Sequence, residues 1–392
     1  MCLQCFCQSL VCIDGMCVIS LELHCPLLYL LCGLFLSFIY IHMTVNIAIN
    51  GYGRIGRDLH RQLIGHPHIK VKAINSRAGA ESHAHLLKYD STYGILPNLV
   101  EARDGKVYVD GEEILVYQEK DPSDLPWGDI EIDVVIESTG KFTKKEGANK
   151  HIEAGAKRVL ITAPCKDKEV ATIVMGVNQG EFDPSDDIIV SNASCTTNCL
   201  APVAKVLNDA FGIEHAFVST IHALTHTQNL LDNSHSDPRR ARSTNSSIIP
   251  TTTGAMKAIG QVIPELNGKM DGMAFRVPVL TGSCIDMVAK LSKDVTVEEV
   301  NKAFIDASES GDLEGILGVS CEPLVSIDFK GNVHSSIVDL LSTKVLPGGL
   351  VKIVSWYDNE WGYVARVVDL IEWMMGGEFK EVGSKVLDEQ AC

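Results

Sequence analysis

The chain contains 392 residues, of which 46% are apolar and 21% are charged, and its formal net charge is −16. A chain of this length can bury one large core or, as we expect, two ordinary ones. The acidic balance disfavours a general nucleic-acid binder, because neutralising phosphates requires a basic surface. Composition therefore favours a protein that acts on small molecules, with no nucleic-acid partner.

The first 43 residues differ in composition from the rest. They hold seven of the 13 cysteines, no Lys or Arg, and an apolar run from Pro26 to Ile41. The run is shorter than the roughly 20 apolar residues of a membrane helix. The missing basic residues disfavour a secretory signal or a transit peptide. The one CxxC pair here, Cys2 with Cys5, has no second pair, so no metal site is predicted.

We interpret residues 1–43 as a cysteine-rich apolar extension that is either absent from the mature protein or a membrane anchor. Contact with a membrane is expected only if this extension is retained. We expect the protein to lie in the cytoplasm, with a plastid or membrane-anchored location as the alternatives.

A glycine-rich turn follows the first apolar strand, predicted at Val45–Asn50. An amphipathic stretch at 58–64 and a second strand at 69–74 complete a βαβ unit. In such a unit the first glycine permits a tight turn, the second lets the backbone approach a pyrophosphate, and the third packs helix on strand. The glycines are Gly51, Gly53 and Gly56. They predict a dinucleotide site, and a tight turn without a ligand is the alternative.

The second strand ends in Asn75, Ser76 and Arg77 rather than in an acidic residue. An acid at this point contacts the ribose 2′-hydroxyl of NAD and would repel a 2′-phosphate. Ser76 can instead donate a hydrogen bond to that phosphate, and Arg77 can pair with it. The sequence therefore favours NADP over NAD, unless Arg77 is only a solvated loop residue.

Further strands are predicted at 132–136 and 159–162, with their carboxyl ends at the ligand edge of an open parallel sheet. After them, Cys195 stands at the start of an apolar helical pattern that Gly212 ends. A helix N-terminus lowers a thiol pKa, so Cys195 is a candidate nucleophile. Cys199 lies one turn further on and is interpreted as a packing residue. The nearest candidate bases are His222 and His226, and spacing does not decide between them.

The motifs together resemble the phosphorylating glyceraldehyde-3-phosphate dehydrogenases. From Val45 to the C-terminus they are NGYGRIGR, LLKYDSTYG, SNASCTTN, IIPTTTGAMKAIG, GMAFRVP and WYDNEWGY. The resemblance implies that Cys195 is the nucleophile and His222 its base. It also implies oxidation of glyceraldehyde 3-phosphate through a cysteine thioester that inorganic phosphate resolves, in a homotetramer of glycolysis or gluconeogenesis.

The resemblance also implies the binding residues. The residues implied for the substrate phosphate are Thr225, Thr227 and Arg276. The residues implied for the attacking phosphate are Ser194, Thr196, Thr253 and Gly254, with Arg240 nearby. For the coenzyme it implies Arg54 and Ile55, whose backbone meets the pyrophosphate, Lys120 and Thr162, and Asn359 at the carboxamide.

Three departures from the family pattern are visible. Ser76 replaces an acid, Asn233-Ser234 replaces an apolar pair, and Val364-Ala365 replaces Ser-Asn. Ser234 resembles the NADP-using photosynthetic members, so the coenzyme is expected to be NADP, or else NAD. The effect of the Val364-Ala365 pair is unassigned.

The expected fold is α/β: a Rossmann-type doubly wound sheet domain over 44–194, completed by 359–392, and an α+β catalytic domain over 195–358. Erythrose-4-phosphate dehydrogenase is an alternative activity on the same scaffold. A non-catalytic, membrane-tethered scaffold protein is the alternative from another class.

Overall fold

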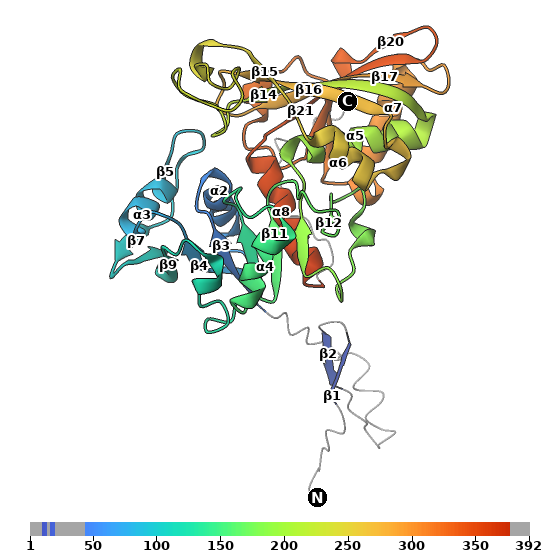
Figure 1. Ribbon diagram of the computed structural model, residues 1–392. Coiled ribbons are helices and arrows are strands. Elements are labelled where there is room, and N and C mark those ends of the chain that lie inside the picture. The colour runs from blue at the N-terminus through green and yellow to red at the C-terminus, as the bar shows by residue number, and fades with distance from the viewer. Residues whose placement is uncertain (1–9, 14–15, 20–43, 377–392) are drawn as a thin grey trace, which may run out of the picture.

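The computed structural model describes residues 10–13, 16–19 and 44–376, which form two sheet-based units (Figure 1). β1 (Leu10–Ile13) and β2 (Met16–Ile19) form a separate antiparallel pair. The apolar run from Pro26 to Ile41 and the Cys2–Cys5 pair lie outside the described residues. Within the described ranges, no helix combines the length and the apolar character needed to cross a membrane.

The first unit is built on a nine-stranded sheet in the order β12-β13-β11-β10-β3-β4-β9-β8-β7. Pairs from β12 to β9 are parallel, and β8 and β7 add an antiparallel edge. The strands are β3 (Val45–Asn50), β4 (Ile69–Asn75), β7 (Val100–Arg103), β8 (Lys106–Val109), β9 (Glu112–Tyr117), β10 (Val134–Glu137), β11 (Arg158–Ile161), β12 (Ala171–Thr172) and β13 (Ile189–Ser191). The helices are α2 (Arg54–Leu63), α3 (Ala80–Lys88) and α4 (Lys145–Glu153).

This sheet confirms the predicted doubly wound architecture. The strand predicted at Val45–Asn50 has those bounds, and the others shift by one or two residues at an end. The helix predicted from Asp58 begins four residues earlier, at Arg54, directly after the glycine turn. Near-continuous apolar runs such as that of β10, all of whose residues are buried, are typical of parallel strands covered on both faces.

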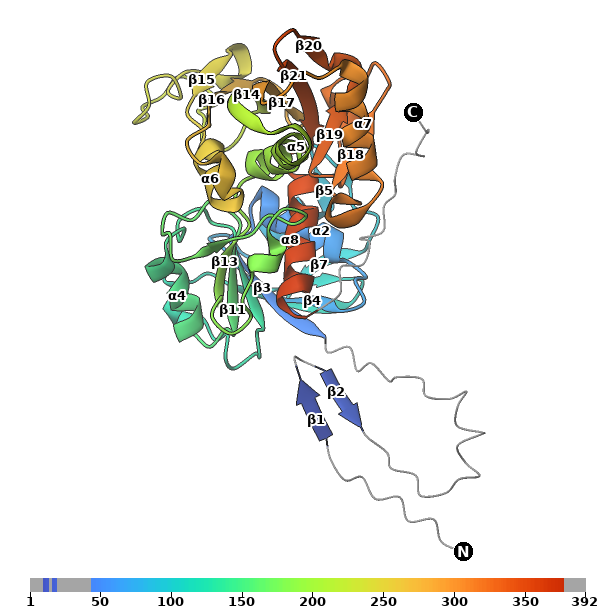
Figure 2. The same ribbon diagram turned by 90° about the vertical axis from the view of Figure 1, so that its right-hand side faces the viewer.

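The second unit holds an eight-stranded mixed sheet in the order β15-β16-β14-β17-β21-β19-β18, with β20 paired to β21. Its strands are β14 (Ile213–Ala223), β15 (Ile249–Thr251), β16 (Met270–Val277), β17 (Ser283–Leu291), β18 (Leu317–Ser320), β19 (Ser336–Asp339), β20 (Lys344–Leu346) and β21 (Leu350–Tyr357). The helices α5 (Cys195–Phe211), α6 (Ala255–Val262) and α7 (Val297–Ser308) lie on the face toward the first unit (Figures 1 and 2). The opposite face carries exposed Phe217, Met273 and Val288.

The last described helix, α8 (Trp361–Met374), returns the chain to the first unit and packs against α2 (Figure 2). Val364 and Ala365 are fully buried on α8. Val364 belongs to the large apolar core, so replacement of a polar pair adds apolar surface to the interior of the protein. β5 (Tyr89–Asp90) and β6 (Gly94–Ile95) form a small hairpin near the start of α8.

Candidate active site

Cys195 stands where a strained turn joins β13 to α5. Ala193 has a φ of 53°, in the left-handed region that residues with a Cβ rarely adopt. Ser194 caps α5, its hydroxyl accepting a hydrogen bond from the Thr197 N–H at 3.1 Å. Gly212 ends the helix with a φ of 72°, as the sequence predicts. The turn thus brings the Cys195 thiol to the N-terminal end of α5.

The thiol faces His222, which lies near the end of β14. Cys195 Sγ is 3.4 Å from His222 Nε2, within the range of a hydrogen bond to sulfur. His226 is exposed and lies in the loop beyond β14. Of the two histidines that spacing left open, the structure therefore brings His222 to the thiol.

The other ring nitrogen of His222 has two close neighbours. Nδ1 lies 2.7 Å from the Ala223 carbonyl oxygen and 2.6 Å from Nη1 of Arg276, which also donates to that carbonyl at 3.1 Å. These two contacts call for different tautomers: Nδ1 carries a hydrogen if it donates to the Ala223 oxygen, whereas Arg276 can donate only to an Nδ1 without one. The tautomer with its hydrogen on Nδ1 leaves Nε2 free to take a proton from the thiol, so it is the one that base catalysis requires. Arg276 reaches this position because its strand, β16, pairs with β14 in a register that sets His222 against Arg276.

Burial sets the protonation of this pair. It raises the pKa of the Cys195 thiol, against the opposing effects of the Arg276 charge and hydrogen bonding by Thr196. It lowers the pKa of His222 to about 3, and the Arg276 charge acts in the same direction. The sequence-based expectation of a lowered thiol pKa is therefore wrong for this geometry, because desolvation of the thiolate outweighs stabilisation at the helix N-terminus. Both groups are neutral, a thiol beside an imidazole that can act as a base.

The predicted phosphate residues lie in two neighbouring loops. The Thr225 and Thr227 hydroxyls are 2.9 Å apart, and Gln228 contacts both of them. This loop follows β14 directly, next to the strand that carries Arg276. Hydroxyls and a guanidinium in one place suit a phosphate dianion.

The second loop joins β15 to α6. Arg240 Nε donates to the Thr251 hydroxyl at 2.7 Å, which brings Arg240 to the predicted Thr253–Gly254 site. Gly254 is the N-cap residue of α6, and the Thr253 hydroxyl accepts from the Ala255 N–H at 3.2 Å. The Thr196 hydroxyl, at the start of α5, lies 3.0 Å from that of Tyr357.

The three glycines of the coenzyme turn have the separate roles that the sequence predicts. Gly51 has a φ of 99°, and a Cβ there would lie 2.6 Å from the Thr139 nitrogen. A Cβ on Gly56 would lie 2.5 Å from the Gly51 oxygen. A Cβ on Gly53 would meet nothing within 4 Å, and Gly53 caps α2 without a side-chain hydrogen bond. The open space beside free helix amides fits the pyrophosphate of a dinucleotide.

The other predicted coenzyme residues lie at the carboxyl ends of the parallel strands. Ser76 and Arg77 follow β4, where the Ser76 nitrogen donates to the Tyr117 oxygen, and the Arg77 side chain is exposed. Lys120 follows β9. Thr162 follows β11, and its hydroxyl donates to the backbone carbonyl oxygen of Glu137, the last residue of β10. Ser234 lies in an exposed loop of the second unit, and among the described residues no hydrogen bond or ion pair links it to Ser76. The structure therefore places Ser76, Arg77, Lys120 and Thr162 after strands of the parallel sheet that also carries the glycine turn, and Ser234 in the second unit.

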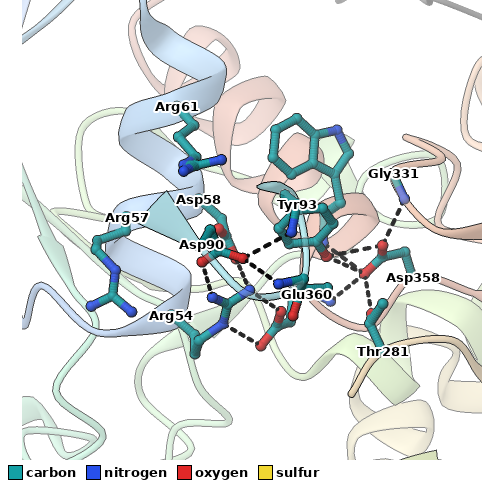
Figure 3. Close-up of polar contacts among 12 residues, drawn as sticks. Arg54, Arg57, Asp58, Arg61, Asp90, Tyr93, Thr281, Gly331, Asp358 and Glu360 are labelled. Carbon is teal, nitrogen blue, oxygen red and sulfur yellow. Dashed lines mark hydrogen bonds and ion pairs between the residues drawn. The ribbon is translucent and has the colours of Figure 1, made fainter. Parts of the chain in front are cut away.

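Sequence reasoning missed the role of the Arg54 side chain, because it assigned only the backbone of this residue to the coenzyme. The guanidinium donates to Glu360 at 2.6 and 2.9 Å and also pairs with Asp90, while Asp58 lies 3.5 Å away (Figure 3). It ties α2 to the start of α8, across 306 positions of the chain. Asp90 and Glu360 lie within two of the recognised motifs, LLKYDSTYG and WYDNEWGY, but nothing in the spacing of those motifs indicates this contact.

A buried network of hydrogen bonds holds Asn359. Asp358 accepts from the Tyr93 and Thr281 hydroxyls and from the Gly331 N–H (Figure 3). The Asn359 side-chain oxygen accepts from the Ser283 hydroxyl at 2.7 Å. Sequence analysis identified Asn359 but none of these partners. No group of three or more metal-ligating side chains occurs in the part of the chain that the structure describes.

Comparisons with known proteins agree with this geometry. Residues 45–145 match the family described as glyceraldehyde 3-phosphate dehydrogenase, NAD binding domain, and residues 194–359 match the corresponding C-terminal domain. The chain is 55% identical over 328 residues to the glyceraldehyde-3-phosphate dehydrogenase of Geobacillus stearothermophilus, covering 84% of this chain and 97% of that protein. It is 54% identical over 334 residues to the protein of that name from Borreliella burgdorferi, covering 84% and 99%. It is 52% identical over 328 residues to glyceraldehyde-3-phosphate dehydrogenase 1 of Bacillus subtilis, covering 84% and 97%.

Proposed function

This chain belongs to the glyceraldehyde-3-phosphate dehydrogenase family of oxidoreductases, and we propose that it oxidises and phosphorylates glyceraldehyde 3-phosphate to 1,3-bisphosphoglycerate. The observation that carries the proposal is the 3.4 Å contact of Cys195 Sγ with His222 Nε2 beside Arg276. It supplies a nucleophile, a base and an anion-binding group in one place. Neither erythrose-4-phosphate dehydrogenase activity nor a non-catalytic scaffold is favoured by any described residue.

Covalent catalysis divides the reaction into two steps. The Cys195 sulfur adds to the aldehyde carbon while His222 Nε2 takes the thiol proton and returns it to the new alkoxide, giving a hemithioacetal. His222 then removes the hydroxyl proton as the carbon loses a hydride and becomes a thioester. When bound, the nicotinamide ring of the coenzyme accepts that hydride. Inorganic phosphate attacks the thioester carbonyl, and the Cys195 thiolate leaves and recovers a proton from His222.

Two anion sites support the chemistry. Thr225, Thr227 and Arg276 hold the phosphate of the substrate, and this contact fixes the aldehyde relative to Cys195. The attacking phosphate is held at the start of α6 by Thr253 and Gly254, with Arg240 alongside. Ser194 and Thr196 complete this second site from the start of α5.

The coenzyme is held by the glycine turn and by the strand ends of the first unit, and NADP is the preferred form. Support comes from the absence of an acid after β4 and from the exposed Arg77 guanidinium, which follows Ser76 and pairs with no described residue. In the cell this preference suits the reductive direction, as in gluconeogenesis. Kinetics with NAD and NADP side by side test it, and Ser76→Asp should shift the preference toward NAD by roughly ten-fold or more, because it sets a carboxylate against the 2′-phosphate.

The enzyme assembles as a homotetramer in the cytoplasm. Support for assembly comes from the uncovered face of the eight-stranded sheet, where Phe217 is 73% exposed next to Met273 and Val288. Native mass spectrometry measures both the assembly state and whether residues 1–43 are retained.

Activity with glyceraldehyde 3-phosphate, coenzyme and phosphate tests the main proposal. The wild-type enzyme should form reduced coenzyme, and Cys195→Ser should abolish it, since a hydroxyl beside His222 is a far weaker nucleophile than the thiol. A wild type that is inactive with both NAD and NADP would refute the proposed function.

A further inference from the structure

We infer that Ser283 is a positioning residue for the coenzyme: its hydroxyl orients the Asn359 amide so that the amide nitrogen, rather than the oxygen, is offered to the nicotinamide carboxamide. The inference rests on the proposed function and on the contact of Asn359 with that carboxamide, which the family resemblance implies. It adds a specificity determinant on β17, outside every motif that the sequence singled out.

A short chain of hydrogen bonds fixes the direction of the amide. The Ala223 N–H donates to Ser283 Oγ at 3.0 Å, and Ser283 Oγ donates to Asn359 Oδ1 at 2.7 Å. A serine hydroxyl has one hydrogen, and Asn359 Oδ1 is its one acceptor among the described residues. Rotating the amide by 180° would turn its nitrogen toward Ser283 and leave the hydroxyl hydrogen without an acceptor. Since Ser283 is 1% exposed, no bulk water is at hand to accept that hydrogen.

The backbone of Asn359 is already fixed on both sides. Asp358 accepts from the N–H groups of Gly331 and Glu360 at 2.8 and 2.9 Å, and Glu360 is paired with Arg54 (Figure 3). Rotation of the side-chain amide is therefore the main motion left to Asn359, and the hydrogen bond from Ser283 prevents this rotation.

The amide nitrogen remains free to bind a ligand. Asn359 Nδ2 donates to no described residue and is not fully sealed from solvent. It is therefore available as a hydrogen-bond donor to a ligand. Such a donor pairs with a carbonyl oxygen and not with an NH₂ group, so it selects the oxygen of the carboxamide.

The orienting chain also begins beside the base. Ala223 follows His222 on β14, and its carbonyl is the one that lies against His222 Nδ1. One residue, Ala223, therefore contacts both groups: its carbonyl oxygen lies against the imidazole of His222, and its N–H reaches Asn359 through Ser283.

The test compares the binding of two coenzymes by titration calorimetry of the full-length enzyme. One is the preferred natural coenzyme, and the other is its 3-acetylpyridine analogue, which keeps the carbonyl oxygen but has no NH₂ group. In Ser283→Ala the amide can rotate, and its oxygen can then accept from the carboxamide NH₂ but only repel the acetyl oxygen. We expect the Kd ratio of analogue to coenzyme to rise about five- to ten-fold relative to wild type, the effect of one hydrogen bond.

Three further variants serve as controls for the expected change in the Kd ratio. Ser283→Thr keeps a hydroxyl and should keep the wild-type ratio. Asn359→Asp offers only acceptor atoms and should shift the ratio at least as far as Ser283→Ala. Ser355→Ala is the matched control, because Ser355 is equally buried on the adjacent strand β21 but bonds to Ser336, and it should leave the ratio unchanged. If Ser283→Ala does not fold, Ser283→Cys, whose thiol is a weak donor, should give a shift in the same direction.

Two results would overturn the inference: equal loss of both ligands in Ser283→Ala, and an unchanged ratio in both Ser283→Ala and Asn359→Asp. If the wild type meanwhile oxidises glyceraldehyde 3-phosphate, the proposed function stands and only the role of Ser283 fails. A wild type that binds neither NAD nor NADP refutes both.

Discussion

Replacing Asp58 by Asn should stabilise the enzyme at neutral and alkaline pH. Asp58 lies on α2, fully buried, with one carboxylate oxygen 3.5 Å from Arg54 and the other without a hydrogen-bond partner. Burial raises the pKa of Asp58 to about 8, and the nearby Glu360 and Asp90 charges act in the same direction, against the charge of Arg54. The folded protein therefore keeps a proton that the unfolded chain releases.

The sign of the effect follows from linkage. The ordinary pKa of Asp is about 3.9, so the folded state is favoured by this group below about pH 4, and that contribution is lost as the pH rises toward about 8. A pH of 7 lies about 3 units above the ordinary pKa of Asp, which corresponds to a loss of at most about 4 kcal/mol from the free energy of unfolding. An amide stays neutral throughout and avoids the loss. We expect a gain of about 2 kcal/mol at pH 7, because the amide also gives up the attraction to Arg54.

The assay is urea unfolding followed by tryptophan fluorescence, with wild type and Asp58→Asn compared at pH 5 and pH 8. The difference in free energy of unfolding between Asp58→Asn and wild type should be larger at pH 8 than at pH 5. Asp306→Asn, which removes an exposed carboxylate paired with Lys302, should show no such growth. A variant that is less stable than wild type at pH 8 would show that Asp58 is ionised and held by Arg54, and the reasoning would be refuted.

Three further substitutions test the site. His222→Asn should lower kcat by about 10²- to 10⁴-fold with little change in coenzyme Kd, because it removes the base and leaves the glycine turn intact; an unchanged kcat would exclude His222 as the base. Gly53→Ala should fold normally, since its Cβ meets no protein atom, but bind coenzyme at least ten-fold more weakly in calorimetry because it fills the pyrophosphate approach. Gly51→Ala should lower the thermal midpoint by several degrees, given its φ of 99° and the close Thr139 nitrogen; equal stability of the two glycine variants would contradict this reading.

Local patterns predicted much of the fold. The strand at Val45–Asn50 has the predicted bounds, and α5 begins at Cys195 and ends before Gly212 as expected. Caps, glycine turns and apolar runs depend on residues close together in the chain, so their consequences can be predicted without the tertiary structure. The start of α2 was placed too late because the glycine turn enters the helix directly.

Contacts between distant parts of the chain were not predictable in this way. Spacing did not choose between His222 and His226, and only the family resemblance implied His222, because the contact depends on how α5 packs on β14. The Arg54–Glu360 pair joins residues 306 positions apart. No spacing rule applies to such pairs, because their geometry is set by the packing of the two units.

The sequence by itself determined the fold class and the family and predicted the nucleophile, since these follow from motifs and periodicities a few residues long. The tertiary structure added the 3.4 Å contact between Cys195 and His222, the burial that raises the pKa of the thiol, and the hydrogen bond from Ser283 to Asn359. Desolvation and hydrogen-bond direction are properties of the packed surroundings. They come into being only when residues far apart in the chain exclude water together.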